Sequence, residues 1–118
     1  MSDRIREITL YETESGRCPV ADFIESIKFR IDRAKIMMVF EGIETIQLIS
    51  PSVFKKLKGS SGLWEIKIRE ARFLGFYVTP RKLVLLHGFN KKSTKTPIHA
   101  IAVARERMRG YCGERELL

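Results

Sequence analysis

The chain has 118 residues, a hydrophobic fraction of 44% and a formal net charge of +8. This length indicates one domain with a modest core, and no apolar run reaches the roughly 18 residues that a membrane helix needs. The first residues lack the apolar stretch of a signal peptide, so we expect a cytoplasmic protein. Cys18 and Cys112 are the only cysteines, and their separation suggests neither a disulfide framework nor a zinc motif.

The first half of the sequence predicts a strand followed by two helices. Residues 6–13 alternate apolar and polar side chains and are rich in β-branched residues, as in a strand. A helix is expected to start at Pro19, because apolar side chains recur after it at helical spacing. A second helical pattern covers about residues 32–48, with Met37 and Met38 interpreted as core. The two helices are expected to form a hairpin.

The second half predicts a loop, three strands and a helix. Residues 50–62 are rich in serine, glycine and lysine, as in a loop. Three strands and a short helix then follow at residues 63–70, 72–79, 82–89 and 97–110, with a flexible tail at residues 110–118. This order predicts the α+β class, a single domain over residues 1–118 with helices on one face of a mostly antiparallel sheet.

The strand at residues 63–70 carries apolar side chains on one face of the predicted sheet and charged side chains on the other. Trp64 and the isoleucines that follow it at every second position are expected to face the core. Glu65, Lys67 and Arg69 then share the opposite face. The alternation therefore predicts a charged surface on one side of this strand.

The strand at residues 82–89 is nearly all apolar, which is typical of a central strand. By simple alternation His87 shares a face with Leu83, Leu85 and Phe89. We therefore interpret His87 as a core or strand histidine and not as a site residue.

Positive charge is concentrated in the second half of the chain. Residues 1–54 carry 7 Lys/Arg and 9 Asp/Glu, a net charge of −2, whereas residues 55–109 carry 14 and 3, a net charge of +11. An asymmetry of this size points to a polyanion, above all nucleic acid, bound by the C-terminal half. A solvated basic surface without a ligand is the alternative.

The sequence lacks the motifs of ordinary hydrolases: a Walker loop, a metal-ligand cluster, paired carboxylates or a Ser/His/Asp set. The residues that converge on one predicted surface are cations, namely Lys67, Arg69, Arg72, Lys91 and Lys92. Arginine is a forked, permanently charged donor to phosphate, and lysines beside other cations exchange protons near neutral pH. RNA supplies its own nucleophile, the 2′-hydroxyl, so such a cluster is able to cleave it. A basic sheet face is, however, more often only a binding surface.

Three segments of this half resemble a known family. They are FKKLKGSSGLWEIKIREARFLGFYV, LVLLHGFNKKSTKTP and IAVARERM, in that order. Over about residues 53–107 the chain resembles the HigB-like branch of the RelE/ParE toxin superfamily, and more narrowly the phage-derived gene-product-forty-nine-like proteins. The resemblance implies a RelE-like fold: an N-terminal strand, a two-helix hairpin, an antiparallel three-strand meander and a C-terminal helix.

The resemblance implies the toxin of a type II toxin–antitoxin module, an endoribonuclease that cleaves messenger RNA in the ribosomal A site by metal-independent 2′-hydroxyl attack. The implied partners are messenger RNA on the ribosome, with contacts to 16S ribosomal RNA, and a HigA-like helix-turn-helix antitoxin from the same operon. No cofactor, metal or membrane partner is implied. Two alternatives stay open: a ParE-like gyrase inhibitor, and an operon co-repressor that binds nucleic acid or antitoxin.

The resemblance also implies roles for individual residues. Arg72 matches the arginine that stabilises the phosphate, Lys67 a basic residue on the preceding strand, and Lys92 the position where a general acid sits. Glu65 stands where some relatives have lysine, and is a candidate general base or an ion-pair partner of Lys67 or Lys91. The RNA-binding candidates are Arg69, Lys91, Lys95, Lys55, Lys56 and Lys58.

One position departs from the family pattern. Many relatives carry a tyrosine that stacks on a codon base, whereas this chain has Ile98 or His99 there. Tyr111, further along the chain, is the candidate that substitutes for it.

Overall fold

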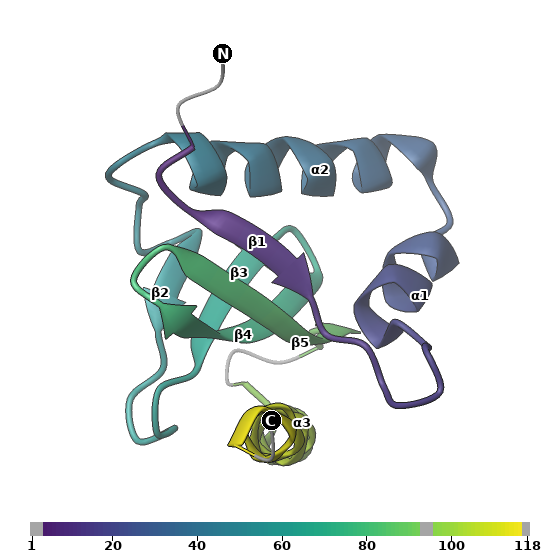
Figure 1. Ribbon diagram of the computed structural model, residues 1–118. Helices are drawn as coiled ribbons and strands as arrows, with labels where there is room; N and C mark the ends of the chain where they lie inside the picture. Colours follow the sequence, from purple (N-terminus) through teal and green to yellow (C-terminus); the bar gives the residue numbers. More distant parts are fainter. Residues whose placement is uncertain (1–3, 93–95, 117–118) are drawn as a thin grey trace.

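The computed structural model describes residues 4–92 and 96–116. The elements, in chain order, are β1 (Glu7–Leu10), α1 (Pro19–Ser26), α2 (Arg30–Thr45), β2 (Phe54–Lys56), β3 (Trp64–Ile68), β4 (Ala71–Thr79), β5 (Lys82–Asn90) and α3 (Ile98–Glu116). Figure 1 shows α2 and α3 on opposite sides of the sheet. The α+β class is confirmed. No helix in the described ranges is long and apolar enough to cross a bilayer.

The five strands form one mixed sheet in the order β1-β5-β4-β3-β2. β1 runs parallel to β5, and all other neighbours are antiparallel, so β3, β4 and β5 form the predicted meander. β2 was predicted as loop, which is wrong. It forms because Phe54 is buried opposite Ile66, while the two lysines after it remain exposed.

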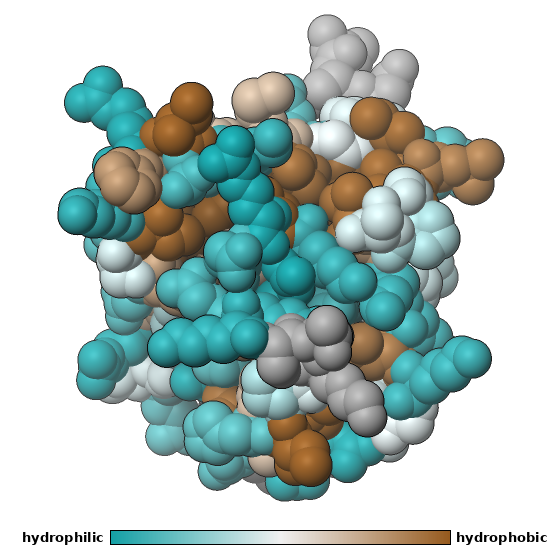
Figure 2. Space-filling view, turned by 180° about the vertical axis from the view of Figure 1, so that it is seen from behind, coloured by the Kyte–Doolittle hydropathy of each residue, from teal (hydrophilic) through white to brown (hydrophobic). Residues whose placement is uncertain are grey.

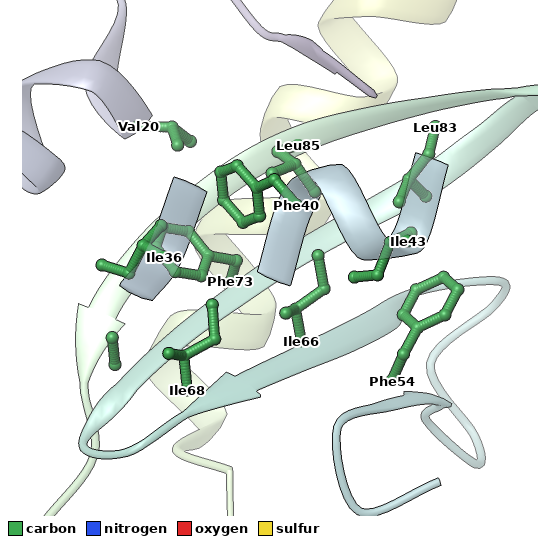
Figure 3. Packing of buried hydrophobic residues seen from close by; sticks show 11 residues of the cluster. Val20, Ile36, Phe40, Ile43, Phe54, Ile66, Ile68, Phe73, Leu83 and Leu85 are labelled. Atoms are coloured by element: carbon green, nitrogen blue, oxygen red, sulfur yellow. The ribbon is translucent and has the colours of Figure 1, made fainter. Parts of the chain in front are cut away.

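The first core lies between the sheet and the helices α1 and α2 (Figure 3). Phe73 of β4 is fully buried at its centre, and its ring meets those of Phe23 and Phe40 edge to face, with centroids 5.6 and 5.1 Å apart. Such aromatic pairs add about 0.5–1.5 kcal/mol each beyond the area that they bury. Ile66 and Ile68 point into this core, as the alternation of β3 predicts.

Helix α2 buries only one stripe of its surface. Ile36, Phe40 and Ile43, spaced by four and three residues, face the sheet. Met37 and Met38 are exposed, so their interpretation as core residues is wrong. α1 and α2, which were expected to form a hairpin, both pack on the sheet: α1 contacts β5, and α2 contacts β1 and β3.

A second core lies on the other face of the sheet, which corrects the expectation that all helices pack on one face. Helix α3 covers it with Ala100 and Ala104. α3 also continues to Glu116, past the predicted end near residue 110, and Tyr111 packs edge-on against Phe76 with ring centroids 5.7 Å apart. The sheet residues beneath α3 are apolar and require such cover: Leu63, Leu74, Phe76, Val84 and Leu86.

Candidate nucleic-acid interface

Two cations face each other across the β3–β4 hairpin. Lys67 is the direct cross-strand partner of Arg72, and Arg72 is in turn opposite Phe89 of β5. Directly opposed residues of an antiparallel sheet carry their side chains on the same face. Leu74, two residues after Arg72, belongs to the core under α3, so this row lies on the α3 side of the sheet.

The side chain of Arg72 is held by the turn that precedes it. Its Nη1 donates hydrogen bonds to the carbonyl oxygens of Ala71, at 2.9 Å, and of Arg69. Its Nε is buried and has no hydrogen-bond partner among the described residues. Leaving a buried donor unpaired costs about 1–3 kcal/mol, so the guanidinium of Arg72 is held at a cost to stability.

Glu65 is a buried carboxylate beside these cations. It is only 1% exposed and lies between Lys55 of β2 and Leu74 of β4 in the sheet register. Its Oε2 accepts a hydrogen bond from Thr96 Oγ1 at 2.7 Å, while its Oε1 has no partner within the described ranges. The alternative ion pair with Lys67 or Lys91 is not formed, because neither amine lies within 4.0 Å of the carboxylate.

The protonated, charged form of the Lys67 amine is disfavoured by its surroundings. Burial, followed by the positive charges of Lys55 and Lys91, lowers its pKa from the usual 10.5, while the charge of Glu65 acts in the opposite direction. A lysine with a lowered pKa exchanges protons nearer to neutral pH than an exposed lysine does. The effect also shows that Lys91 lies within electrostatic reach of Lys67.

A β-bulge brings His87 to the α3 side, so the face predicted by simple alternation is wrong. The β4–β5 register shifts between Leu74, which is opposite His87, and Gly75, which is opposite Leu85. Gly75 permits this close approach, since a Cβ atom there would lie 2.5 Å from the carbonyl oxygen of Val84. A glycine inside a strand often marks such a bulge, and this signal could have predicted it.

His87 lies between an aromatic ring and an arginine that the sequence did not identify. Its ring stacks on Phe89 with centroids 5.4 Å apart. Arg107 Nη1 lies 3.4 Å from His87 Nδ1 and donates to the carbonyl oxygen of Leu86 at 2.8 Å. Burial, together with the charges of Arg107 and His99, lowers the pKa of His87 to about 4. The imidazole is therefore neutral at pH 7.

Arg69 does not share a face with Lys67, contrary to the prediction. β3 ends at Ile68, and Arg69 adopts a left-handed backbone conformation with φ of 54° in the β3–β4 turn. Its Nη1 reaches Asp32 of α2 at 3.2 Å. The alternation ends with the strand, so the side chain of Arg69 turns toward the helices.

The lysines after β5 differ in their surroundings. Lys91 is buried, at 7% exposure, and its backbone N–H donates to the carbonyl oxygen of Glu70 at 2.8 Å. Lys92 is exposed and, with Arg69, lines a cleft that faces α2. Lys95 lies outside the described residues. Of the two described lysines, Lys91 is the one whose charge acts on Lys67.

The three lysines of β2 and the β2–β3 loop also differ in where they point. Lys55 is opposite Glu65 and therefore lies on the α3 side of the sheet, whereas Lys56 is opposite Trp64 and points to the other side. Lys58 lies in the loop, and all three are exposed. Only Lys55 thus belongs to the row of charged side chains around Lys67.

These residues form one surface, which we call the cation face: Lys55, Glu65, Lys67, Arg72, His87, Phe89 and Lys91. Figure 2 shows the molecule from behind. Hydrophilic side chains predominate across the middle of this view, and hydrophobic ones gather mainly in its upper part. Four cations around one carboxylate are suited to contact a phosphate group. The neutral imidazole and the aromatic ring beside them are suited to stack on a nucleobase. The fold and this surface define a small basic α+β domain with a cluster of cations on one face of its sheet.

Comparison with protein families places the chain more narrowly. Residues 29–109 match the family model described as "Phage derived protein Gp49-like (DUF891)". The match spans more than half of the chain, which therefore belongs to the phage-derived Gp49-like family. This family is associated with the toxins of toxin–antitoxin systems, and the observed topology is consistent with a RelE-like fold. No curated protein matches the chain.

Proposed function

We propose that this protein is a HigB-like toxin of a type II toxin–antitoxin module that cleaves messenger RNA on the ribosome. The observation that carries the proposal is the opposition of Lys67 and Arg72 on one sheet face, with no carboxylate of the described chain within 4.0 Å of either. Like charges placed directly opposite each other destabilise a sheet. A phosphate between them would relieve this repulsion and accept charge-assisted hydrogen bonds.

In the proposed reaction, the 2′-hydroxyl oxygen of RNA attacks the adjacent phosphorus and the P–O5′ bond breaks. The products are a 2′,3′-cyclic phosphate and a 5′-hydroxyl. Arg72 and Lys67 stabilise the extra negative charge on the non-bridging oxygens. One group must remove the proton of the 2′-hydroxyl, and another must protonate the leaving O5′.

The arrangement of the cation face supports an assignment of these two proton transfers. Glu65 is the proposed base, because its Oε1 is buried without a partner in the described ranges. The neutral imidazole of His87 is the second group able to accept a proton. Lys91, whose charge acts on Lys67, is the proposed acid, and the exposed Lys92 is left to bind the RNA backbone.

The proposed partners follow from the resemblance and from the distribution of charge. Messenger RNA on the ribosome is the proposed substrate in the cytoplasm, and Lys56 and Lys58, which are exposed, are the proposed contacts to 16S ribosomal RNA. The proposed antitoxin is a HigA-like helix-turn-helix protein encoded in the same operon. Family membership supports the toxin assignment, and the opposed cations support the choice of nuclease chemistry.

A gyrase inhibitor without ribonuclease activity is the second candidate. It is favoured by the lack of a stacking tyrosine at the start of α3, where Ile98 and His99 stand exposed. The candidate substitute, Tyr111, packs against Phe76. The nuclease and the gyrase inhibitor act on different substrates, so one experiment is able to separate them.

The test compares RNA ends with DNA supercoiling. Ribosomes programmed with a defined message are incubated with the protein, and the fragments are treated with polynucleotide kinase without prior dephosphorylation. Direct labelling of the new 5′ ends is the expected result because each cut leaves a 5′-hydroxyl. Intact RNA combined with inhibition of gyrase supercoiling would favour the second candidate.

A further inference from the structure

A cleft lies across the β3–β4 turn from the cation face. It has a volume of about 840 Å³ and is bounded by the connection between α1 and α2, the β3–β4 turn and the segment after β5. It does not overlap the row formed by Lys67 and Arg72. Its charged lining residues are Lys28, Asp32, Arg69, Glu70, Lys91 and Lys92.

The cleft has an excess of positive charge after internal pairing. Asp32 and Arg69 form an ion pair at 3.2 Å, so their charges largely cancel. Glu70 is exposed at the turn, where solvent screens it. Lys91 is only 7% exposed, and none of the carboxylates in the described ranges lies within 4.0 Å of its amine. The ammonium of Lys91 therefore has no carboxylate partner in the described ranges, and an anionic ligand would supply an ionic partner.

The backbone around the cleft also favours an anion. Helix α2 begins at the cleft, and its N-cap residue Phe29 provides no side-chain capping bond. The N-terminus of a helix carries a partial positive charge and free N–H groups. The hydrogen bond from Lys91 N to Glu70 O, at 2.8 Å, fixes the turn against the segment after β5. The cleft is therefore built from elements that hold one another in place.

We propose that this cleft binds a second phosphate of the RNA strand whose scissile phosphate lies on the cation face. The inference rests on the proposed function and specifies how that site holds its substrate. Lys91 links the two places, because it lines the cleft and its charge reaches Lys67. Phe29 is exposed beside the cleft with Lys28 Nζ 5.5 Å from its ring centroid, and offers a surface on which a neighbouring base stacks.

The experiment measures RNA binding apart from cleavage. Fluorescently labelled 2′-O-methyl oligoribonucleotides, which lack the nucleophile, are titrated with the protein at several salt concentrations. One oligonucleotide is long enough to reach both places, and a dinucleotide is long enough for the cation face alone. The variants are Lys28→Ala in the cleft and Lys35→Ala, which removes an exposed lysine of α2 outside the cleft.

We expect Lys28→Ala to weaken binding of the long oligonucleotide roughly threefold to tenfold and to reduce its salt slope by about 0.7, the contribution of one phosphate contact on a single strand. The dinucleotide should bind both variants and the wild type alike. Lys35→Ala should change neither affinity by more than about twofold, because it lies outside the contact. Amide chemical shifts of Lys28, Asn90 and Lys91 should move when the long oligonucleotide is added.

Several results would overturn the inference. Equal losses in the two variants would reveal general electrostatic attraction, and unchanged affinity in Lys28→Ala would remove the subsite. Wild-type protein that binds no RNA would overturn it as well. A different result would contradict the proposed nuclease activity alone: the oligonucleotide binds in a manner that depends on Lys28, but messenger RNA on ribosomes is never cut. Cleavage that persists while Lys28→Ala binds like wild type contradicts the subsite alone.

Discussion

Lys67 of β3 lies directly opposite Arg72 of β4, so two cations share one face of the sheet next to a buried carboxylate, Glu65. Neither cation has an ionic partner within the part of the chain that the structure describes. This arrangement opposes folding, because like charges repel and Lys67 is in addition desolvated. Such local destabilisation is common where a site must bind a ligand or do chemistry.

We predict that Lys67→Met stabilises the protein and abolishes cleavage. The pKa of Lys67 is lowered in the folded state, so the charged amine destabilises the fold in full below the folded pKa. That destabilisation disappears only as pH rises toward the unfolded value of 10.5. At pH 7 the substitution should raise Tm by roughly 1–4 °C. Calorimetry and a cleavage assay on the same sample measure both effects.

Lys35→Met is the matched control for this substitution, since Lys35 is exposed on α2, which packs on the sheet face opposite the cation face. It should leave cleavage unchanged. A fall in Tm for Lys67→Met, or full activity in that variant, would contradict the role given to Lys67.

Acid should weaken the fold through His87. Its pKa is about 4 in the folded state and 6.5 when unfolded, so the unfolded chain binds the proton more readily between these values. The contribution of His87 to stability is present above pH 6.5 and is lost as pH falls toward 4. For a half-exposed ring we expect a loss of about 1–2 kcal/mol. His87→Asn should flatten this dependence in urea unfolding between pH 7 and pH 4.5. If the stability of wild type and His87→Asn depended on pH in the same way, the role given to His87 would be wrong.

The bulge that brings His87 to the cation face depends on Gly75. Gly75→Ala places a methyl group 2.5 Å from the carbonyl oxygen of Val84 and should destabilise the protein by about 1–3 kcal/mol. Gly113→Ala in α3 meets no atom within 4 Å and should stabilise it by about 0.5–1 kcal/mol. Chemical denaturation measures both. A Gly75→Ala protein as stable as wild type would show that the strands need no close approach there.

Arg105 of α3 holds the β2–β3 loop, which carries Lys58. Its Nη2 donates to the carbonyl oxygen of Gly59 at 3.0 Å and its Nε to that of Ser60 at 3.3 Å. Arg105→Gln should speed amide hydrogen exchange in residues 57–62 severalfold, while global stability falls by no more than about 1 kcal/mol. Unchanged exchange in this loop would mean that other contacts order it.

The sequence predicted the parts of the fold that depend on regular alternation. Trp64 and Ile66 face the first core because β3 remains extended over its whole length, so period-two patterning holds. β2 could not be predicted in the same way, since only Phe54 of its three residues is buried. Met37 and Met38 were misplaced because apolar character alone does not show which side of a helix is covered.

The candidate site was predicted only where it lies on regular strand. The opposition of Lys67 and Arg72 follows from alternation across a tight hairpin. Arg69 was misplaced because the strand ends one residue earlier, and His87 because a bulge changes the phase of β5. Both errors come from single backbone irregularities that reverse the direction of a side chain.

The central claim is that Arg72 stabilises a scissile phosphate on ribosome-bound messenger RNA. The most direct measurement adds purified protein to a defined message in cell-free translation, with and without ribosomes, and maps 5′ ends by primer extension for wild type, Arg72→Ala and Arg72→Lys. We predict cuts in phase with codons that require ribosomes, fall at least about 100-fold in Arg72→Ala and recover only partly in Arg72→Lys. An intact message at wild-type concentrations that arrest growth, or undiminished cutting by Arg72→Ala, would contradict the claim.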